Sequence, residues 1–282
     1  MKKLLTLFLL FYAFFTQAQE SFFRGNNNYK LPKSSVNGSS GTFTQDGLIL
    51  NLDAGNPASY AGTGTTWTNL APAGSAIVPN FSLSSGITYR PENGGTLRFS
   101  SAGGSVASSN TSFGVLSQFT LEIWVNIAGT IGEQAPGGNY APCLFSDKYG
   151  GNNDVNMMLA YNSNDFGAPT NDFRFTAGIN NGGNWSWYEP STNYSEIVNN
   201  WIQIVYIYDG NTTTLYKNGI SIGSQALNTS PTSASLGYYI GHRWDMNDYV
   251  FGDYSIVNMY NRPLTPSEVS SNFAAVKSRF GL

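Results

Sequence analysis

One stretch of the sequence constrains the fold more than any other. Residues 201–223 read WIQIVYIYDGNTTTLYKNGISIG. Within 201–208, apolar side chains stand at both odd and even positions, which is typical of a strand buried on both faces. The dipeptides Asp209-Gly210 and Asn218-Gly219 suit two-residue hairpin turns, because these residue types accept positive φ at low steric cost. The segment therefore predicts a meander of antiparallel strands, the first of them inside a core.

Similar short runs of β-branched and aromatic residues recur from Gly47 onward, separated by clusters of Gly, Asn, Asp and Pro. They include residues 48–53, 96–100, 119–127, 155–161 and 172–179. This spacing is typical of a sandwich or barrel of antiparallel strands. No repeat of fixed period is visible, which argues against a propeller or a solenoid.

The C-terminal segment predicts one short helix. Thr265, Pro266 and Glu268 supply an N-cap, a proline at the first helical position and a glutamate at the third, which together form a capping box. An apolar stripe follows at helical spacing, formed by Val269, Phe273, Val276 and Phe280. We expect this helix to pack against the sheets rather than to form a second domain.

The N-terminus has the pattern of an export signal. Lys2 and Lys3 precede a short apolar region, residues 4–15, which is too short to span a membrane as a helix. We expect a signal peptide over residues 1–18, a flexible leader over 19–46 and one domain over 47–282. The protein is then extracellular, at the cell surface or periplasmic. We do not expect a lipoprotein, because no cysteine stands immediately after the cleavage site, where a lipid would be attached.

The charge content limits the expected partners, and the cysteine content limits the expected sources of stability. Charged residues make up 11% of the chain and the formal net charge is −3. No basic run is present, which excludes nucleic acid as an expected partner. The single cysteine, Cys143, cannot form an internal disulfide, so stability has to come from packing.

Several segments in order resemble a laminin G-like domain, of the concanavalin A-like jelly-roll type found in bacterial and viral surface proteins. They are residues 47–56, 119–127, 201–210, 214–224, 238–243 and 251–273, the last closing on Y-N-R-x-L-T-x-x-E. The resemblance covers about residues 47–282. It implies an all-β, concanavalin A-like jelly-roll sandwich of two antiparallel sheets with one short C-terminal helix. It also implies binding of sugars or proteins rather than catalysis.

Within this pattern, residues 251–260 look like the penultimate long strand of the family. Tyr254, Ile256 and Tyr260 are then expected on one face, with Val257 and Met259 on the other. Gly252 is expected to permit a close backbone approach or a bulge.

No catalytic motif is complete. The single histidine, His242, ends a predicted strand and is expected to be a hydrogen-bonded edge residue, and one His with one Cys cannot build the usual zinc site. Residues 219–223 match G-x-S-x-G but lie on a hairpin instead of a strand-to-helix turn. Glycosidases need paired carboxylates, and Glu122 and Glu189 stand apart with no E-x-D motif. We expect a non-enzyme, although carboxylates from separate loops leave a hydrolase open.

Two loops combine the residue types that bind sugars, aromatic faces for stacking and polar groups for the hydroxyls. The candidate ligand-binding residues are Asn184, Trp185, Trp187, Tyr188, Trp244, Asp245, Asn247 and Asp248. The alternative is that Trp185 and Trp187 point into the core and Trp244 covers a sheet edge. The favoured hypothesis is an exported, non-catalytic module that recognises a glycan or a surface partner. The alternative is a structural or accessory subunit of an outer-membrane or cell-surface protein complex.

Calcium is the one cofactor that the resemblance suggests, because family members often hold it with oxygen ligands at a sheet rim. Asp53 and Asp253 are candidates from opposite ends of the domain. Asp147 and Asp154 form a second, loop-borne candidate pair. Neither pair has the regular spacing of a dedicated calcium loop.

Overall fold

The computed structural model describes residues 43–72, 80–100, 104–129, 142–148, 158–162, 173–181, 184–192, 194–227, 231, 236–242 and 249–282. Residues 39–282 belong to one compact unit. The signal peptide expected over residues 1–18 and most of the expected leader lie outside the described residues. Among the described residues, no helix has the length and apolar character needed to cross a membrane.

The described strands form two antiparallel sheets, which confirms the predicted fold class. Sheet A has eight strands and runs β15-β14-β13-β7-β17-β5-β4, with β1 paired to β17. The strands are β15 (Ile220–Ala226), β14 (Thr212–Lys217), β13 (Trp201–Tyr208), β7 (Phe119–Ile127), β17 (Gly252–Tyr260), β5 (Thr96–Phe99), β4 (Thr88–Arg90) and β1 (Leu48–Asp53). Most of these were predicted from sequence within a residue or two.

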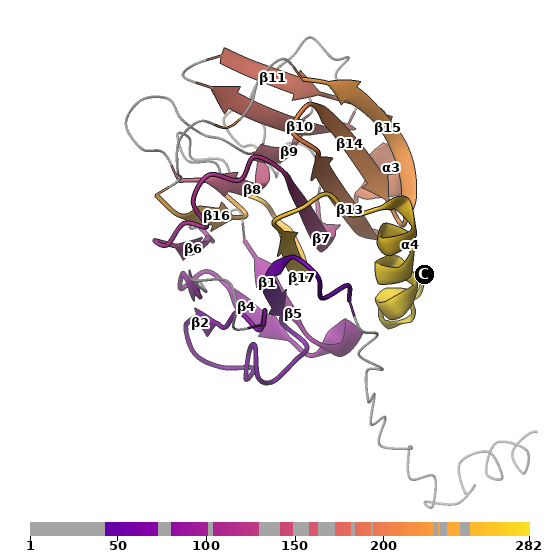
Figure 1. Cartoon of the computed structure of the whole chain (residues 1–282). Coiled ribbons are helices and arrows are strands. Elements are labelled where there is room, and N and C mark those ends of the chain that lie inside the picture. The colour runs from indigo at the N-terminus through magenta and orange to yellow at the C-terminus, as the bar shows by residue number, and fades with distance from the viewer. Residues whose placement is uncertain are drawn as a thin grey trace, which may run out of the picture. The chain divides into compact units, whose positions relative to one another are not determined.

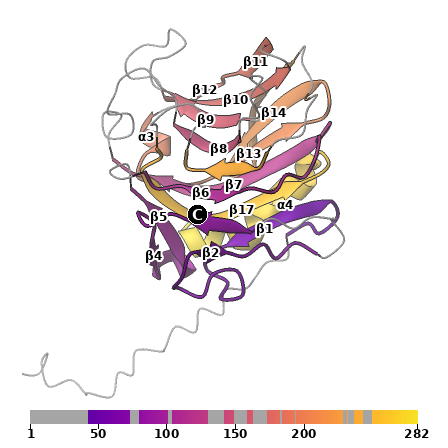
Figure 2. The same cartoon turned by 90° about the vertical axis from the view of Figure 1, so that its left-hand side faces the viewer.

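Sheet B has nine strands and runs β11-β10-β9-β8-β16-β6-β3-β2, with β12 paired to β10. The strands are β11 (Asn184–Tyr188), β10 (Phe173–Asn181), β9 (Met158–Asn162), β8 (Cys143–Asp147), β16 (Tyr238–Ile240), β6 (Ala107–Ser109), β3 (Phe81–Leu83), β2 (Thr66–Trp67) and β12 (Ser191–Thr192). Figure 2 shows β10, β9 and β8 side by side in this sheet.

The described residues include four short helical elements. They are η1 (Glu92–Gly94), α3 (Tyr194–Ile197), α4 (Pro266–Val276) and η2 (Lys277–Phe280). In Figure 1, α4 lies beside the strands of sheet A, with the chain end next to it. The capping box predicted at Thr265 and Glu268 is present, with Pro266 in the first turn.

The predicted double burial of β13 is confirmed and has a clear cause. Tyr206 belongs to the main core between the two sheets. Val205 instead packs with Leu264 and Val269, at the start of α4. The outer face of sheet A is therefore buried under the C-terminal helix, so both faces of β13 need apolar side chains.

The faces of β17 differ from the sequence expectation. The register shifts between Tyr254 and Ile256, where the pairing with β7 has an irregularity. As a result Tyr254 joins the core between the sheets, whereas Ile256 packs with Trp124 beneath α4. Strict alternation predicts Tyr254 and Ile256 on the same face. That prediction is wrong, because an extra residue in a strand moves every later side chain to the opposite face. The close approach expected at Gly252 is present, since a Cβ there would stand 2.5 Å from the carbonyl oxygen of Asn126.

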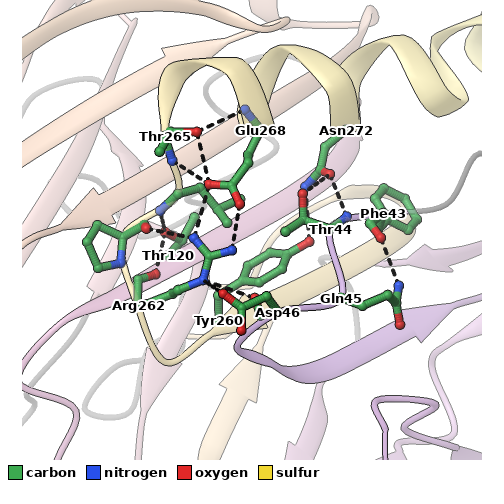
Figure 3. Close-up of polar contacts among 12 residues, drawn as sticks. Phe43, Thr44, Gln45, Asp46, Thr120, Tyr260, Arg262, Thr265, Glu268 and Asn272 are labelled. Carbon is green, nitrogen blue, oxygen red and sulfur yellow. Dashed lines mark hydrogen bonds and ion pairs between the residues drawn. The ribbon is translucent and has the colours of Figure 1, made fainter.

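The segment 43–46, expected to belong to the leader, is bound to the helix. The backbone N and the Oγ1 of Thr44 both donate to the Oδ1 of Asn272, at 2.9 and 3.2 Å. Arg262 forms an ion pair with Asp46 at 2.8 Å and with Glu268 at 2.6 Å. Figure 3 shows these contacts together at the start of α4. Thr44 and Asp46 are therefore held by side chains of α4 and of the turn before it, and the Y-N-R-x-L-T-x-x-E motif supplies Arg262 and Glu268 to these contacts.

Candidate functional site

The candidate site lies on the outer face of sheet B, the face turned away from sheet A. Its centre is Tyr239 on β16. Tyr238, the preceding residue, is 1% exposed in the core, where its ring lies 5.4 Å from that of Phe145. Because successive residues of a strand point to opposite faces, Tyr239 stands on the outer face, where it is partly exposed. Its register partners there are Ser108 and Ser146.

Two further rings lie next to Tyr239. The His242 ring is 5.1 Å from that of Tyr239, and the Tyr249 ring is 4.6 Å from that of His242. All three are partly exposed. An antiparallel bridge pairs His242 with Tyr249. Tyr239, His242 and Tyr249 together form what we call the aromatic platform.

Gly241 sets the direction in which the chain leaves β16 toward the platform. Its φ is +77°, a conformation that side chains with a Cβ rarely adopt. A Cβ at this position would also stand 2.6 Å from the ring of Phe99. The backbone after β16 is thereby fixed, and the Oγ of Ser146 donates to the carbonyl oxygen of His242 at 3.1 Å.

Polar groups border the platform. The Lys148 ammonium lies 4.7 Å from the centre of the Tyr239 ring and donates to the Oδ1 of Asn110. Burial lowers the pKa of Lys148. Asn110 is exposed, and Ser108 is partly exposed. The arrangement offers ring faces for stacking beside amide, hydroxyl and ammonium groups, which is the combination that holds a sugar.

The first group of predicted ligand-binding residues, Asn184, Trp185, Trp187 and Tyr188, was expected in a loop. This expectation is wrong, because these residues form strand β11 and pair with β10. On β11, Asn184, Trp185 and Trp187 pair with Asn181, Asn180 and Gly178, and their side chains lie outside the described part of the chain. Tyr188 is partly buried, with its hydroxyl 3.4 Å from the carbonyl oxygen of Ile222. It therefore bridges toward β15.

The second predicted loop, with Trp244, Asp245, Asn247 and Asp248, lies outside the described residues. Its two ends, His242 and Tyr249, belong to the aromatic platform. Sequence reasoning assigned His242 an edge role and did not select Tyr239, Lys148 or Asn110. The available signal was the Tyr238-Tyr239 pair, since one of two adjacent strand residues must face outward.

The predicted calcium ligand Asp53 faces a guanidinium. Its Oδ1 accepts from the Nη1 of Arg279 at 2.8 Å and from the backbone N of Gly55 at 2.8 Å. The same guanidinium donates to the Oγ of Ser255 at 2.7 Å and to the carbonyl oxygen of Gly95 at 2.9 Å. An arginine cation thus occupies the oxygen cluster around Asp53.

Asp253 is engaged in the same way, because its Oδ2 lies 2.6 Å from the Nη1 of Arg98. Burial raises the pKa of Asp253, and Arg98 acts in the opposite direction. Asp147 is 1% exposed on β8, and Asp154 lies outside the described residues. Among the described residues, no group of three His, Cys, Asp or Glu side chains could hold a metal ion. Calcium takes six or more oxygen ligands, and Asp53 and Asp253, held by arginines, do not fit it.

The carboxylate considered for catalysis, Glu122, is sealed inside the protein. It is fully buried on the outer side of β7, beneath α4. Its two oxygens accept from Trp124, Gln203 and Asn272 at 3.1, 2.7 and 2.9 Å. Burial raises its pKa, and these hydrogen bonds act against that rise. A carboxylate in this position has a structural role and cannot reach a substrate. Glu189 follows β11 and is partly exposed.

A sandwich of two antiparallel sheets is the architecture of jelly-roll lectin domains. The chain belongs to the concanavalin A-like lectin/glucanases superfamily, whose laminin G family model matches residues 99–270. No curated protein matches the chain.

Solved structures with the same fold are distant in sequence. The binding domain of Paraclostridial Mosquitocidal Protein 1 is 17% identical with a TM-score of 0.60, over 81% of this chain and 52% of that one. The botulinum neurotoxin serotype D ligand-binding domain, in complex with N-acetylneuraminic acid, is 11% identical with a TM-score of 0.58. The match covers 82% of this chain and 51% of that domain. This chain therefore spans about half the length of these toxin domains.

A third structure is matched along almost all of its length. Domain 4 of AbnA, an extracellular arabinanase of family GH43 from Geobacillus stearothermophilus, in complex with arabinotriose, is 13% identical with a TM-score of 0.55. The match covers 81% of this chain and 99% of that domain. Because all three structures share less than about 20% sequence identity with this chain, their similarity shows a common fold only.

Proposed function

We propose that this protein is an exported, non-catalytic carbohydrate-binding module whose binding face is the aromatic platform of sheet B. The observation that carries the proposal is the contact of three partly exposed rings, Tyr239, His242 and Tyr249, on one outer face. Aromatic faces pack against the C–H surfaces of pyranose rings, while nearby polar groups pair with the hydroxyls. Ser108 and Asn110 supply such groups from β6 and the residue after it.

Other findings support the proposal. Two of the structural neighbours were solved with saccharides, N-acetylneuraminic acid and arabinotriose. Glu122, the carboxylate that a hydrolase mechanism would have recruited from β7, is fully buried. The apolar N-terminal residues 4–15 support export. Further proposed contributors to the same function are Trp185 and Trp187 of β11, and Trp244, Asp245, Asn247 and Asp248.

The test is a glycan array followed by calorimetry on the best saccharide, with wild type, Tyr239→Ala and Tyr89→Ala. Tyr89 is the matched control, because it is 36% exposed and its ring lies 5.7 Å from that of Tyr60, but it belongs to β4 of sheet A. Losing one stacking ring should weaken binding about tenfold, a little above 1 kcal/mol. We expect that loss for Tyr239→Ala and no change for Tyr89→Ala. No binding to any saccharide, or full affinity in Tyr239→Ala, would overturn the proposal.

A second candidate function is an accessory subunit of a surface complex. The observation that favours it is the edge strand β15, which has no charged residue and exposes Ile220 by 71%. An uncharged edge can pair with a strand of another protein. If β15 binds a surface partner, Ser224→Lys on this edge should abolish co-purification with that partner, and Tyr239→Ala should leave it intact. If instead Tyr239→Ala abolishes co-purification and Ser224→Lys does not, the aromatic platform is the binding face.

A further inference from the structure

Lys148 differs from the other partly buried cations whose side chains the structure describes. Arg98, Lys217, Arg262 and Arg279 each form an ion pair with a carboxylate. The contacts of the Lys148 ammonium are neutral: the Oδ1 of Asn110 and the face of the Tyr239 ring. No carboxylate of the described residues forms an ion pair with it.

The position of Lys148 is fixed by the sheet. Its backbone N donates to the carbonyl oxygen of Gly237 at 2.8 Å, directly after β8. Gly237 in turn packs against the next strand, because a Cβ there would stand 2.0 Å from the carbonyl oxygen of Ser109. Lys148, Gly237 and Asn110 therefore form a row across three strands. This row is two positions along the strands from the row that contains Tyr239, so the two rows face the same side of the sheet. The ammonium stands at the end of the aromatic platform.

The energetics of Lys148 favour an anion beside it. Burial lowers the pKa of its ammonium, because the charged form has lost water and no carboxylate of the described residues forms an ion pair with it. An anionic group placed against it would replace that lost solvation and form a charge-assisted hydrogen bond. Neutral hydroxyls offer less, because they bring dipoles and no opposite charge.

We propose that the saccharide bound by the platform is acidic, with a carboxylate or a sulfate ester held by Lys148 while the sugar ring stacks on Tyr239 and His242. This inference rests on the proposed function and names its ligand class. Asn110, which is exposed, holds the ammonium through its Oδ1 and keeps its amide N–H groups for the sugar hydroxyls. In this arrangement Lys148 selects for charge and the rings select for a sugar.

The experiment compares charged and uncharged members of two saccharide pairs by titration calorimetry with the purified chain. One pair is trigalacturonate and its methyl ester; the other is a 6-sulfated galactose oligosaccharide and its unsulfated form. We expect at least one acidic member to bind about tenfold more tightly than its neutral partner at low salt, and this preference to fall as salt rises. The pair that responds tells whether carboxylate or sulfate is the charge.

Variants assign the effect to Lys148. Lys148→Gln should remove the preference, so that the charged and neutral members bind equally, and Lys148→Arg should keep it. Lys277→Gln is the control, because Lys277 also lies over a ring, that of Phe273 at 5.6 Å, but beside α4. Equal binding of charged and neutral members, or a preference that survives Lys148→Gln, would overturn the inference and leave the proposed function standing. Absence of all saccharide binding would remove the proposed function itself.

Discussion

The Nδ2 of Asn272 on α4 donates to the Oε2 of Glu122 on β7 at 2.9 Å, which joins residues 150 positions apart. Asn272 also accepts from Thr44 through its Oδ1. One asparagine thus links the centre of sheet A, the C-terminal helix and the start of the domain. The apolar part of this contact is Trp124, whose ring stacks on those of Phe273 and Phe280 at 5.7 and 4.6 Å.

Replacing the buried carboxylate should cost substantial stability. Trp124 and Gln203 donate to the Oε1 of Glu122 and Asn272 donates to its Oε2. In Glu122→Gln one of these two oxygens becomes an NH2 group, so the buried donors on that side lose their acceptor. We expect a loss of about 1–3 kcal/mol in the free energy of unfolding, measured by urea denaturation. Glu196→Gln, on a side chain that is 51% exposed, is the control and should change it by less than about 0.5 kcal/mol. Equal effects of the two substitutions would show that the buried network is unimportant.

Glu122 should also give the protein a distinctive pH dependence. Burial raises its pKa above the ordinary value of 4.5, so the folded state binds the proton more tightly than the unfolded chain. Its contribution to stability is then fully present below pH 4.5 and declines as the pH rises through the folded pKa. The stability difference between wild type and Glu122→Gln should therefore shrink from pH 4 to pH 8. A difference that grows over this range would contradict the raised pKa.

The contribution of Glu268 to stability should depend on pH in the opposite direction to that of Glu122. Its hydrogen bonds with Arg262 lower its pKa to about 2, from an ordinary 4.5. Stability from this ion pair and capping box is present above pH 4.5 and is lost as the pH falls through about 2. Glu268→Gln should therefore cost about 1 kcal/mol at pH 7 and little at pH 2. Urea titrations at the two pH values test this, with Glu196→Gln as the comparison on a more exposed side chain.

Calcium should not stabilise the protein, because Arg279 already supplies a cation to Asp53. We expect the melting temperature to agree within about 1 °C in EDTA and in millimolar calcium, whereas a bound ion at a hundred times its Kd would raise it by about 5 °C or more. Such a rise would mean that calcium binds at Asp53 in spite of the guanidinium, or at the other predicted pair, Asp147 and Asp154.

Arg279 itself should be needed for stability. Arg279→Ala removes its contacts with Asp53, Ser255 and Gly95, and should cost about 2 kcal/mol or more. Arg90→Ala is the control, since that side chain is 47% exposed and lies 3.9 Å from Asp253. It should cost less than about 0.5 kcal/mol.

Gly241 and Gly114 form a matched pair for testing the turn after β16. Their φ angles are +77° and +79°, so alanine meets the same backbone strain at both. Only at Gly241 would the new Cβ collide with a ring, 2.6 Å from Phe99, whereas nothing lies within 4 Å of Gly114. Gly241→Ala should therefore lower stability by at least about 2 kcal/mol more than Gly114→Ala, in thermal or urea unfolding. Equal losses would show that Phe99 moves aside freely.

Much of the fold follows from local sequence. The bounds of β1 and β7 match the predicted runs residue for residue, and the capping box at Thr265 is present. The meander of β13, β14 and β15 follows from two hairpin dipeptides and an apolar run. These features depend on neighbouring residues in the chain, so their physics is contained in the sequence.

The prediction failed where one residue changed the parity of a strand. Alternation along residues 251–260 placed Tyr254 with Ile256, but the irregularity between them puts the two on opposite faces of sheet A. Whether a strand accommodates an extra residue is decided by its partners on both sides, here β5 and β7. That information is absent from the strand's own pattern.

The sequence by itself determined the strands, the hairpin turns, the capped helix and hence the class of fold, because periodicity and turn chemistry act over a few residues. Only the tertiary structure decided which polar groups meet. Asp53 and Arg279 are 226 positions apart, yet the sheet and the last helical turn bring them within 2.8 Å. An aspartate has the same chemistry whether it faces a metal ion or a guanidinium, so its role is set by the strand and helix that pack beside it.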